Sequence, residues 1–234
     1  MKTIKILSLA LFSLFIIGCS ISEEITFNAN GSINYSYLID ASNLTEMASD
    51  KDKKNYDTIV SLAGFLEEGK DSISMLSPEF QKKLTDFKRC SLKIHNDVDK
   101  KEYFVQILGD FPNSTSLNTV LSELSRSSPR DSFTEILELL ASTSYDWNGK
   151  ELRKTSVVPE NPENIKNDSS AEDPLYLFAG GKFRAKYHFP KKVKKVSDPS
   201  AVISQDGKSV IIEYDASEYL TSSEKNNFII ELED

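Results

Sequence analysis

Two Asn-Gly pairs, each set between runs of alternating apolar and polar residues, constrain this chain to antiparallel β structure at two places. Asn30-Gly31 separates residues 24–28 from residues 32–39, and Asn148-Gly149 lies within residues 145–152. Both central positions of a type I′ turn need a positive φ, which Asn and Gly tolerate best. Alternation places every second side chain on one face of a strand. We therefore predict a β-hairpin at each place, with one face buried.

The rest of the chain predicts a mixture of strands and helices. Apolar spacing and capping patterns favour helices within residues 42–90, 117–124 and 132–140. Alternation predicts another hairpin over residues 92–107 and a series of strands in residues 183–232. We expect an α+β fold, with an antiparallel sheet built from the N-terminal hairpin and the C-terminal strands and a helical middle segment packed on it.

The first residues have the layout of an export signal. Lys2 and Lys5 precede an apolar core over residues 6–17, which is too short to cross a bilayer as a permanent helix. Ile16-Ile17-Gly18-Cys19 then resembles a bacterial lipobox, the motif at which Cys19 is lipidated and becomes the first mature residue. An ordinary cleaved signal peptide and an uncleaved anchor are the alternatives. The lipobox predicts acylation of Cys19, with chains such as palmitate that hold the protein on a membrane.

This leader sets the predicted domain organisation. Residues 1–18 form a lipoprotein signal peptide, residues 19–24 a short tether, and residues 25–234 a single α+β domain. Residues 157–174 contain three prolines and almost no apolar side chains, which predicts a flexible loop. Such a loop is long for a compact domain, so the alternative is a boundary between residues 25–156 and residues 175–234.

Charge and cysteine content exclude several classes of function. The 234-residue chain has a net charge of −8, and loss of the leader lysines makes it more acidic. We therefore expect no nucleic-acid partner. The chain has 2 cysteines, and lipidation of Cys19 leaves Cys90 alone, which excludes an intramolecular disulfide and a Cys-based zinc site. Cys90 is expected to pack as a small apolar residue.

No catalytic or metal motif stands out from the sequence. His95 and His188 are the only histidines, and each lies on a predicted strand. Asp50, Asp52 and Asp57 do not have the spacing of an EF-hand, because Lys54 occupies the fifth position. We therefore assign no catalytic residue, no metal site and no cofactor, and we expect that the protein is not an enzyme.

One basic stretch reverses the acidic character of the chain. Its cations are Lys182, Arg184, Lys186, Lys191, Lys192, Lys194 and Lys195, and no acidic residue interrupts them. The functional interpretation is a patch for an anionic lipid surface or an acidic envelope protein. The alternative is the solvent face of a strand whose lysines block edge-to-edge pairing.

Two segments resemble a known group of proteins. They are Ile25 to Ser32, directly after the anchor, and Phe189-Pro190-Lys191-Lys192-Val193 followed by residues 204–210. Together they are similar to uncharacterised lipoproteins of the Bacteroidota and, more loosely, to the LppM-like lipoprotein domain of actinobacteria. The resemblance implies an envelope-facing α+β module and supplies no catalytic residue.

Three hypotheses for function follow. The first is a lipid-anchored protein of the cell envelope, on the outer membrane, with a non-catalytic binding or structural role. The second is a carrier of a lipid or other apolar ligand, for which we expect a cavity lined by Tyr35, Tyr37, Phe183 and Tyr187. The third is a hydrolytic enzyme, which carboxylates gathered around His95 or His188 would support.

Overall fold

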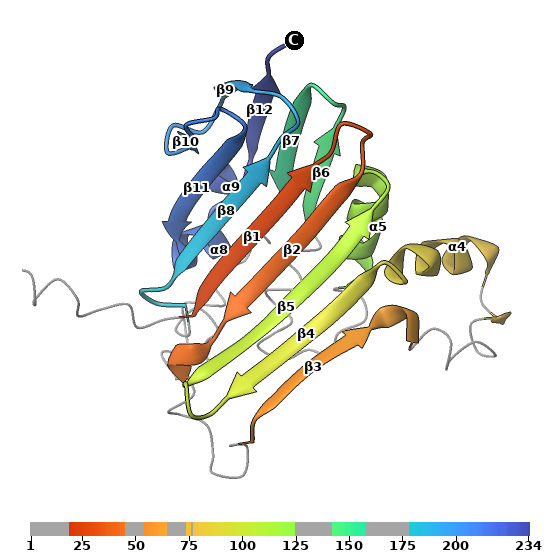
Figure 1. Ribbon diagram of the computed structural model, residues 1–234. Coiled ribbons are helices and arrows are strands. Elements are labelled where there is room, and N and C mark those ends of the chain that lie inside the picture. Colours follow the sequence, from red (N-terminus) through yellow and green to blue (C-terminus); the bar gives the residue numbers. More distant parts are fainter. Residues whose placement is uncertain (1–18, 45–53, 65–73, 76, 125–141, 158–177) are drawn as a thin grey trace, which may run out of the picture.

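The computed structural model describes residues 19–44, 54–64, 74–75, 77–124, 142–157 and 178–234. Eight strands form one large sheet, here sheet A, in the order β10-β11-β8-β1-β2-β5-β4-β3 (Figure 1). The strands of sheet A are β1 (Ser20–Phe27), β2 (Ile33–Asp40), β3 (Tyr56–Ser61), β4 (Cys90–Asp97), β5 (Glu102–Phe111), β8 (Lys182–His188), β10 (Val202–Ile203) and β11 (Ser209–Asp215).

Four strands form a second sheet, here sheet B, in the order β6-β7-β12-β9. They are β6 (Thr143–Trp147), β7 (Glu151–Ser156), β9 (Val193–Val196) and β12 (Phe228–Leu232). The helices are α4 (Pro78–Phe87), α5 (Ser114–Leu124), α8 (Ala216–Thr221) and α9 (Ser223–Asn226), together with the 3-10 turn η2 (Ser42–Leu44). The fold is therefore the α+β class that the sequence predicts, and the helical part of the described residues is modest.

Strands from the two ends of the chain meet in both sheets. In sheet A, β1 pairs antiparallel with β2 on one side and parallel with β8 on the other. In sheet B, β12 pairs antiparallel with β7 and with β9. The predicted sharing of a sheet by N-terminal and C-terminal strands is confirmed, and residues on both sides of segment 157–174 contribute to both sheets.

The turns explain why these strands pair as they do. Gly31 has a φ of 86° between β1 and β2, and Gly149 has a φ of 89° between β6 and β7. Both values lie in the left-handed region that glycine adopts without a steric penalty. The two Asn-Gly hairpins predicted from the sequence are thus confirmed, and so is the hairpin of β4 and β5. The Asn-Gly turns are not of type I′, because neither Asn30 nor Asn148 has a positive φ.

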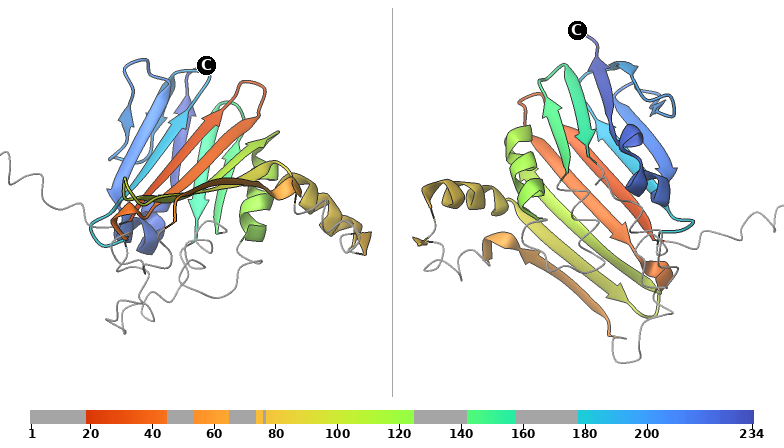
Figure 2. Two further views of the ribbon diagram at one scale, coloured as in Figure 1. Left: turned by 60° about the horizontal axis from the view of Figure 1, so that its bottom comes forward. Right: turned by 180° about the vertical axis from the view of Figure 1, so that it is seen from behind.

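The core lies between the two sheets. Sheet B, α5, α8 and α9 lie on one face of sheet A, whereas α4 extends beyond its β3–β4 edge (Figure 2). Alternate side chains of β1 and β2 point into this interior, among them Ile25, Phe27, Ile33 and Tyr35, all buried. Trp147 from sheet B packs against Phe27 with ring centroids 5.1 Å apart.

The prediction of helix over residues 42–90 is wrong for its middle part. Residues 56–61 form β3, which pairs antiparallel with β4 along six register positions from Tyr56↔Asn96 to Ser61↔Ser91. The β-branched run Thr58-Ile59-Val60 favours extended backbone, and an exposed edge strand lets Ile59 remain 65% exposed. The predicted helix over residues 132–140 lies outside the described residues, and so does the predicted loop over residues 157–174 apart from Val157.

Within the part of the chain that the structure describes, no helix has both the length and the apolar composition needed to cross a membrane.

Candidate functional site

A buried ion pair joins the two sheets. Glu23 projects inward from β1, and Lys154 projects inward from β7 of the opposite sheet, with both side chains 0% exposed. The Lys154 Nζ lies 3.1 Å from Oε2 and 3.4 Å from Oε1 of Glu23. Charged groups are almost never fully buried unless they are paired, so this pair is the most unusual feature of the interior.

Two tyrosine hydroxyls complete the hydrogen bonding of the carboxylate. The hydroxyl of Tyr145, on β6, donates to Glu23 Oε2 at 2.8 Å, and the hydroxyl of Tyr187, on β8, donates to Glu23 Oε1. Lys154 Nζ also donates to the Tyr187 hydroxyl at 3.3 Å. Glu23 therefore accepts from three side chains, which offsets part of the free energy lost when its charge leaves water.

Aromatic rings surround the ammonium group. Its Nζ lies 5.3 Å from the ring centroids of Phe183 and Tyr219, 5.7 Å from that of Tyr145 and 5.8 Å from that of Phe228. At these distances the ring faces attract a cation, most strongly where water is excluded. Burial nevertheless lowers the pKa of Lys154, and the charge and hydrogen bond of Glu23 oppose that shift.

Five tyrosines in this interior are held in their neutral form. Burial, followed by the negative charge of Glu23 or of neighbouring groups, raises the pKa of each well above its usual value. They are Tyr35, Tyr37, Tyr145, Tyr187 and Tyr219. The hydroxyls of Tyr35, Tyr37 and Tyr219 have no hydrogen-bond partner among the described residues. A buried hydroxyl without a partner costs about 1–3 kcal/mol, so a polar group or water is expected to meet them.

The sequence analysis missed Glu23 and Lys154 as core residues. It did select Tyr35, Tyr37, Phe183 and Tyr187 as the lining of a cavity, and all four are buried around this ion pair. Their rings, however, pack against other side chains: Phe183 stacks on Tyr219 with centroids 3.4 Å apart, and Tyr187 meets Phe228 at 5.5 Å. These contacts place neighbouring rings directly against two of the four side chains expected to line the cavity.

Cys19, the predicted lipidation site, lies directly before β1. The sequence predicts a tether over residues 19–24. Residues 20–24 instead form the first part of β1, so the prediction of a tether is wrong for them. The alternation continues back through Ile21, whose side chain is 0% exposed, and Glu23 occupies the next inward position. The thiol of Cys19 is buried, which with the charge of Asp40 raises its pKa to about 11.

The other cysteine behaves as the sequence predicts. Cys90 begins β4, is 1% exposed and belongs to the apolar core. Burial, with a smaller contribution from the charge of Asp86, raises the pKa of its thiol to about 12. The structure therefore places Cys90 as an unreactive packing residue.

The predicted basic patch divides into two parts. The cations of β8 lie on the outer face of sheet A, and each meets an acid of a neighbouring strand. Lys182 Nζ is 2.7 Å from Asp215, Arg184 Nε is 3.6 Å from Glu213, and Lys186 Nζ is 3.6 Å from Glu24. This part is neutralised by cross-strand pairs.

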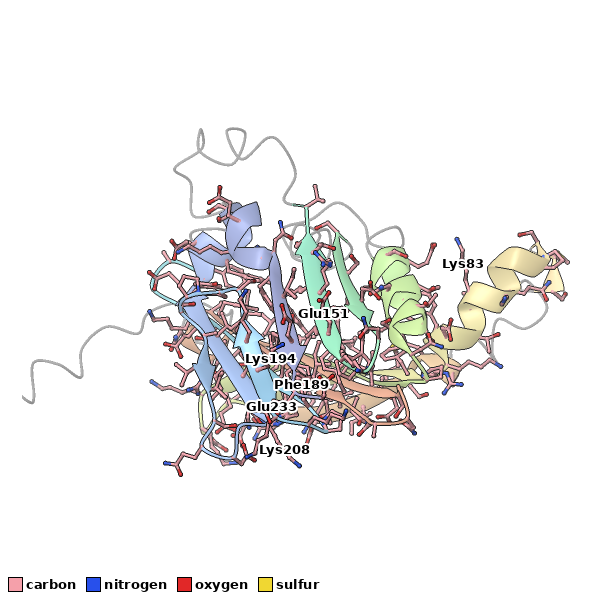
Figure 3. The ribbon with its side chains drawn as sticks, turned by 90° about the horizontal axis from the view of Figure 1, so that it is seen from above. Lys83, Glu151, Phe189, Lys194, Lys208 and Glu233 are labelled. Atoms are coloured by element: carbon pink, nitrogen blue, oxygen red, sulfur yellow. The ribbon has the colours of Figure 1, made fainter. Side chains whose placement is uncertain are left out.

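The second part lies where β8 ends and β9 begins. Lys191, Lys192, Lys194 and Lys195 are all exposed. Figure 3 looks onto this end of the molecule and labels Lys194, Lys208 and Glu233 there. The backbone links these segments, because Glu233 N–H donates to the carbonyl of Lys192 at 2.8 Å. The four lysines remain the candidates for an anionic partner, which stays a prediction.

Each histidine has a carboxylate beside it. His188 Nε2 is 2.8 Å from Glu24 Oε1, and its Nδ1 is 2.9 Å from the hydroxyl of Ser209. The hydrogen bond with His188 lowers the pKa of Glu24, helped by the charge of Lys186. The three groups come from adjacent strands on the outer face of sheet A, where such polar side chains form cross-strand ladders. His95 lies on the same outer face, on β4.

Comparison with protein families gives no match, and comparison with curated protein sequences gives none. Among solved structures, the chain is similar to the NMR structure of the folded domain of LppM from Mycobacterium tuberculosis. The two share 9% sequence identity over 94% of each chain, with a TM-score of 0.45. This is a distant structural similarity. The resemblance to lipoproteins of the Bacteroidota stays a prediction.

Proposed function

We propose that this protein is a lipid-anchored protein of the bacterial cell envelope whose α+β domain has a non-catalytic binding or structural role. The observation that carries the proposal is the leader that ends in Gly18-Cys19, with β1 beginning at the next residue. Strand β1 lies inside sheet A, between β8 and β2. Acyl chains on Cys19 would therefore hold the folded sheet itself at the membrane, without an intervening linker.

Acyl chains on Cys19 would bind the membrane strongly enough for stable attachment. Each buried CH₂ of an acyl chain contributes about 0.8 kcal/mol, and a lipoprotein cysteine with two or more chains is attached stably. The leader that precedes Cys19 supports export to the envelope, and we propose the outer membrane as its destination.

The orientation that follows from the anchor suggests a partner. β8 runs parallel to β1, so His188 and the lysines that follow lie at the end of sheet A opposite Cys19. Eight residues of strand span about 26 Å at the usual rise per residue. Lys191, Lys192, Lys194 and Lys195 would thus face away from the anchoring membrane, which favours an acidic envelope partner over lipids of that same membrane.

Fractionation of cells tests the anchor directly. Replacing Cys19 with Ser removes the thiol that is acylated, so we expect the protein to move from the membrane fraction to the soluble fraction. Cys90→Ser is the matched control, because Cys90 is the other cysteine of the chain. Retention of Cys19→Ser in membranes, in the same amount as Cys90→Ser, would contradict the proposal.

Transport of an apolar ligand is the second candidate. The three unpartnered tyrosine hydroxyls favour it, because a polar group of a bound molecule would satisfy them. The tight ring contacts around Lys154 count against it. Mass spectrometry of organic extracts from the purified protein decides: a stoichiometric lipid would support a carrier, and its absence would leave the binding or structural role.

A further inference from the structure

His95 is surrounded by carboxylates and an aromatic ring. His95 lies on the outer face of sheet A near the end of β4, and its side chain is only 17% exposed. The imidazole stacks on the ring of Phe104, the cross-strand residue of β5, with centroids 4.7 Å apart and planes 18° from parallel. This contact fixes the ring plane and directs its two nitrogens toward the neighbouring strands.

Carboxylates stand on both sides of the ring. Nε2 lies 3.4 Å from Glu102 Oε2, and Nδ1 lies 3.5 Å from Asp57 Oδ1. Both ring nitrogens are buried, and neither makes a hydrogen bond to a described residue. Ligand atoms of His95, Asp97 and Glu102 all lie within 4.8 Å of one another.

We propose that this cluster is a binding site for a divalent transition metal, Zn²⁺ in the first place. Nε2 of His95 and the carboxylates of Asp97 and Glu102 would be its ligands, and Asp57 would orient the imidazole through Nδ1. Zinc accepts this set of nitrogen and oxygen donors, and three protein ligands leave one position open for water or a partner's side chain.

The spacing of one donor pair matches that around a tetrahedral ion. Two ligands that each lie 2.0–2.1 Å from the metal are about 3.4 Å apart at the tetrahedral angle. That value agrees with the 3.4 Å between His95 Nε2 and Glu102 Oε2. Asp97 and Glu102 are directly opposite each other in the β4–β5 pair, so both carboxylates leave the same face of the sheet.

Asp57 is placed to hold the imidazole of His95 without binding the metal itself. Metal-binding histidines usually donate their second N–H to a carboxylate, which fixes the tautomer and the ring orientation. Asp57 is the cross-strand partner of His95 on β3, and Lys93 Nζ holds its carboxylate at 3.4 Å. Three strands therefore contribute to one cluster.

An ion must displace only a surface lysine to enter. Lys100 Nζ lies 2.9 Å from Asp97 Oδ2, but the Lys100 side chain is 67% exposed. An exposed pair of this kind contributes little to stability.

Calorimetric titration of the purified mature chain with zinc chloride alone, in chelator-free buffer at pH 7.5, tests the site. We expect one Zn²⁺ per chain. His95→Ala and Glu102→Gln should each weaken binding by at least about 10-fold, and Asp57→Asn should weaken it by about 10-fold through the lost orienting carboxylate. His188→Ala is the matched control, because it removes the other histidine, and it should bind zinc as the parent does.

Zinc binding by the variants distinguishes a specific site from its absence. Saturable binding that falls in the His95, Glu102 and Asp57 variants supports the site, and circular dichroism of each variant confirms that the fold is kept. The isosteric Glu102→Gln carries the test if His95→Ala does not fold. Absence of saturable binding, equal binding by Glu102→Gln, or loss of binding in His188→Ala would overturn the assignment.

Discussion

Removal of one partner from the buried Glu23–Lys154 pair should destabilise the domain strongly. Lys154→Met keeps most of the side-chain volume but removes the ammonium group that lies 3.1 Å from Glu23. The carboxylate is then left uncompensated in an interior where its side chain is 0% exposed. Loss of one partner of such a pair typically costs about 3–5 kcal/mol, a large part of the 5–15 kcal/mol expected for a whole domain.

Glu23→Gln removes the opposite charge and adds a dependence on pH. Burial already lowers the pKa of Lys154, and Glu23 opposes this shift, so loss of Glu23 should lower that pKa further. The unfolded chain then binds more protons than the folded chain between the lowered pKa and the usual value near 10.4. Stability of Glu23→Gln should therefore rise as the pH increases from about 7 to 9.

The double variant Glu23→Gln/Lys154→Met tests whether the two residues act as a pair. Replacement of both charges leaves no uncompensated ion, so the loss should be about 1–2 kcal/mol, well below the sum of the single losses. Lys182→Met is the exposed control. It breaks a pair whose atoms are 2.7 Å apart but whose side chains are 49% and 62% exposed, and it should cost no more than about 1 kcal/mol.

Urea unfolding of the leaderless chain, followed by the fluorescence of Trp147, supplies the free energies. Trp147 is the only tryptophan and packs against both Phe27 and Phe189, so its emission reports the loss of the core. Single losses below about 1 kcal/mol, or a double loss equal to their sum, would refute the reasoning that the pair is dry and coupled.

Three further predictions concern other parts of the molecule. Each of the five buried tyrosines has a pKa that is raised in the folded state, so the folded chain keeps protons that the unfolded chain loses above pH 10. The free energy of unfolding should therefore fall by up to about 1.4 kcal/mol per pH unit per tyrosine. Absorbance at 295 nm should show these five tyrosines ionising only on unfolding. Gly109→Ala should cost about 1–3 kcal/mol, since a Cβ there would lie 2.6 Å from the Phe111 ring; an unchanged melting temperature would contradict this. Anionic vesicles can stand in for an acidic partner of the exposed Lys191, Lys192, Lys194 and Lys195, and replacing these four with Ser should weaken sedimentation with the vesicles. Replacing the ion-paired Lys182, Arg184 and Lys186 should matter little; the reverse result would place the patch on β8.

Local chemistry made the hairpins and their faces predictable. The glycine of each Asn-Gly pair takes the positive φ expected of it, and the alternation around the pair marks which side chains are buried. Neither asparagine has a positive φ, so the turns are not of type I′. His95 and His188 lie on strands, as predicted. The short helix α5 followed from its apolar spacing.

Pairing between distant segments was not visible in the sequence. Glu23 appeared to belong to a solvated tether, because its partner Lys154 lies on another sheet and neither residue suggests a core position by itself. Residues 56–61 were expected to be helical, since a short apolar run fits either period and the edge of β4 decides the outcome. The His95 cluster draws on three strands, so no local spacing could reveal it.

The central claim is that Cys19 carries acyl chains and joins the membrane directly to β1. Intact mass spectrometry of the mature protein purified from membranes tests it most directly. The account predicts a chain that starts at Cys19 and carries the added mass of two or three acyl chains, with none of residues 1–18. An unmodified chain that starts at Ser20 or later, or one that keeps its leader, would contradict it.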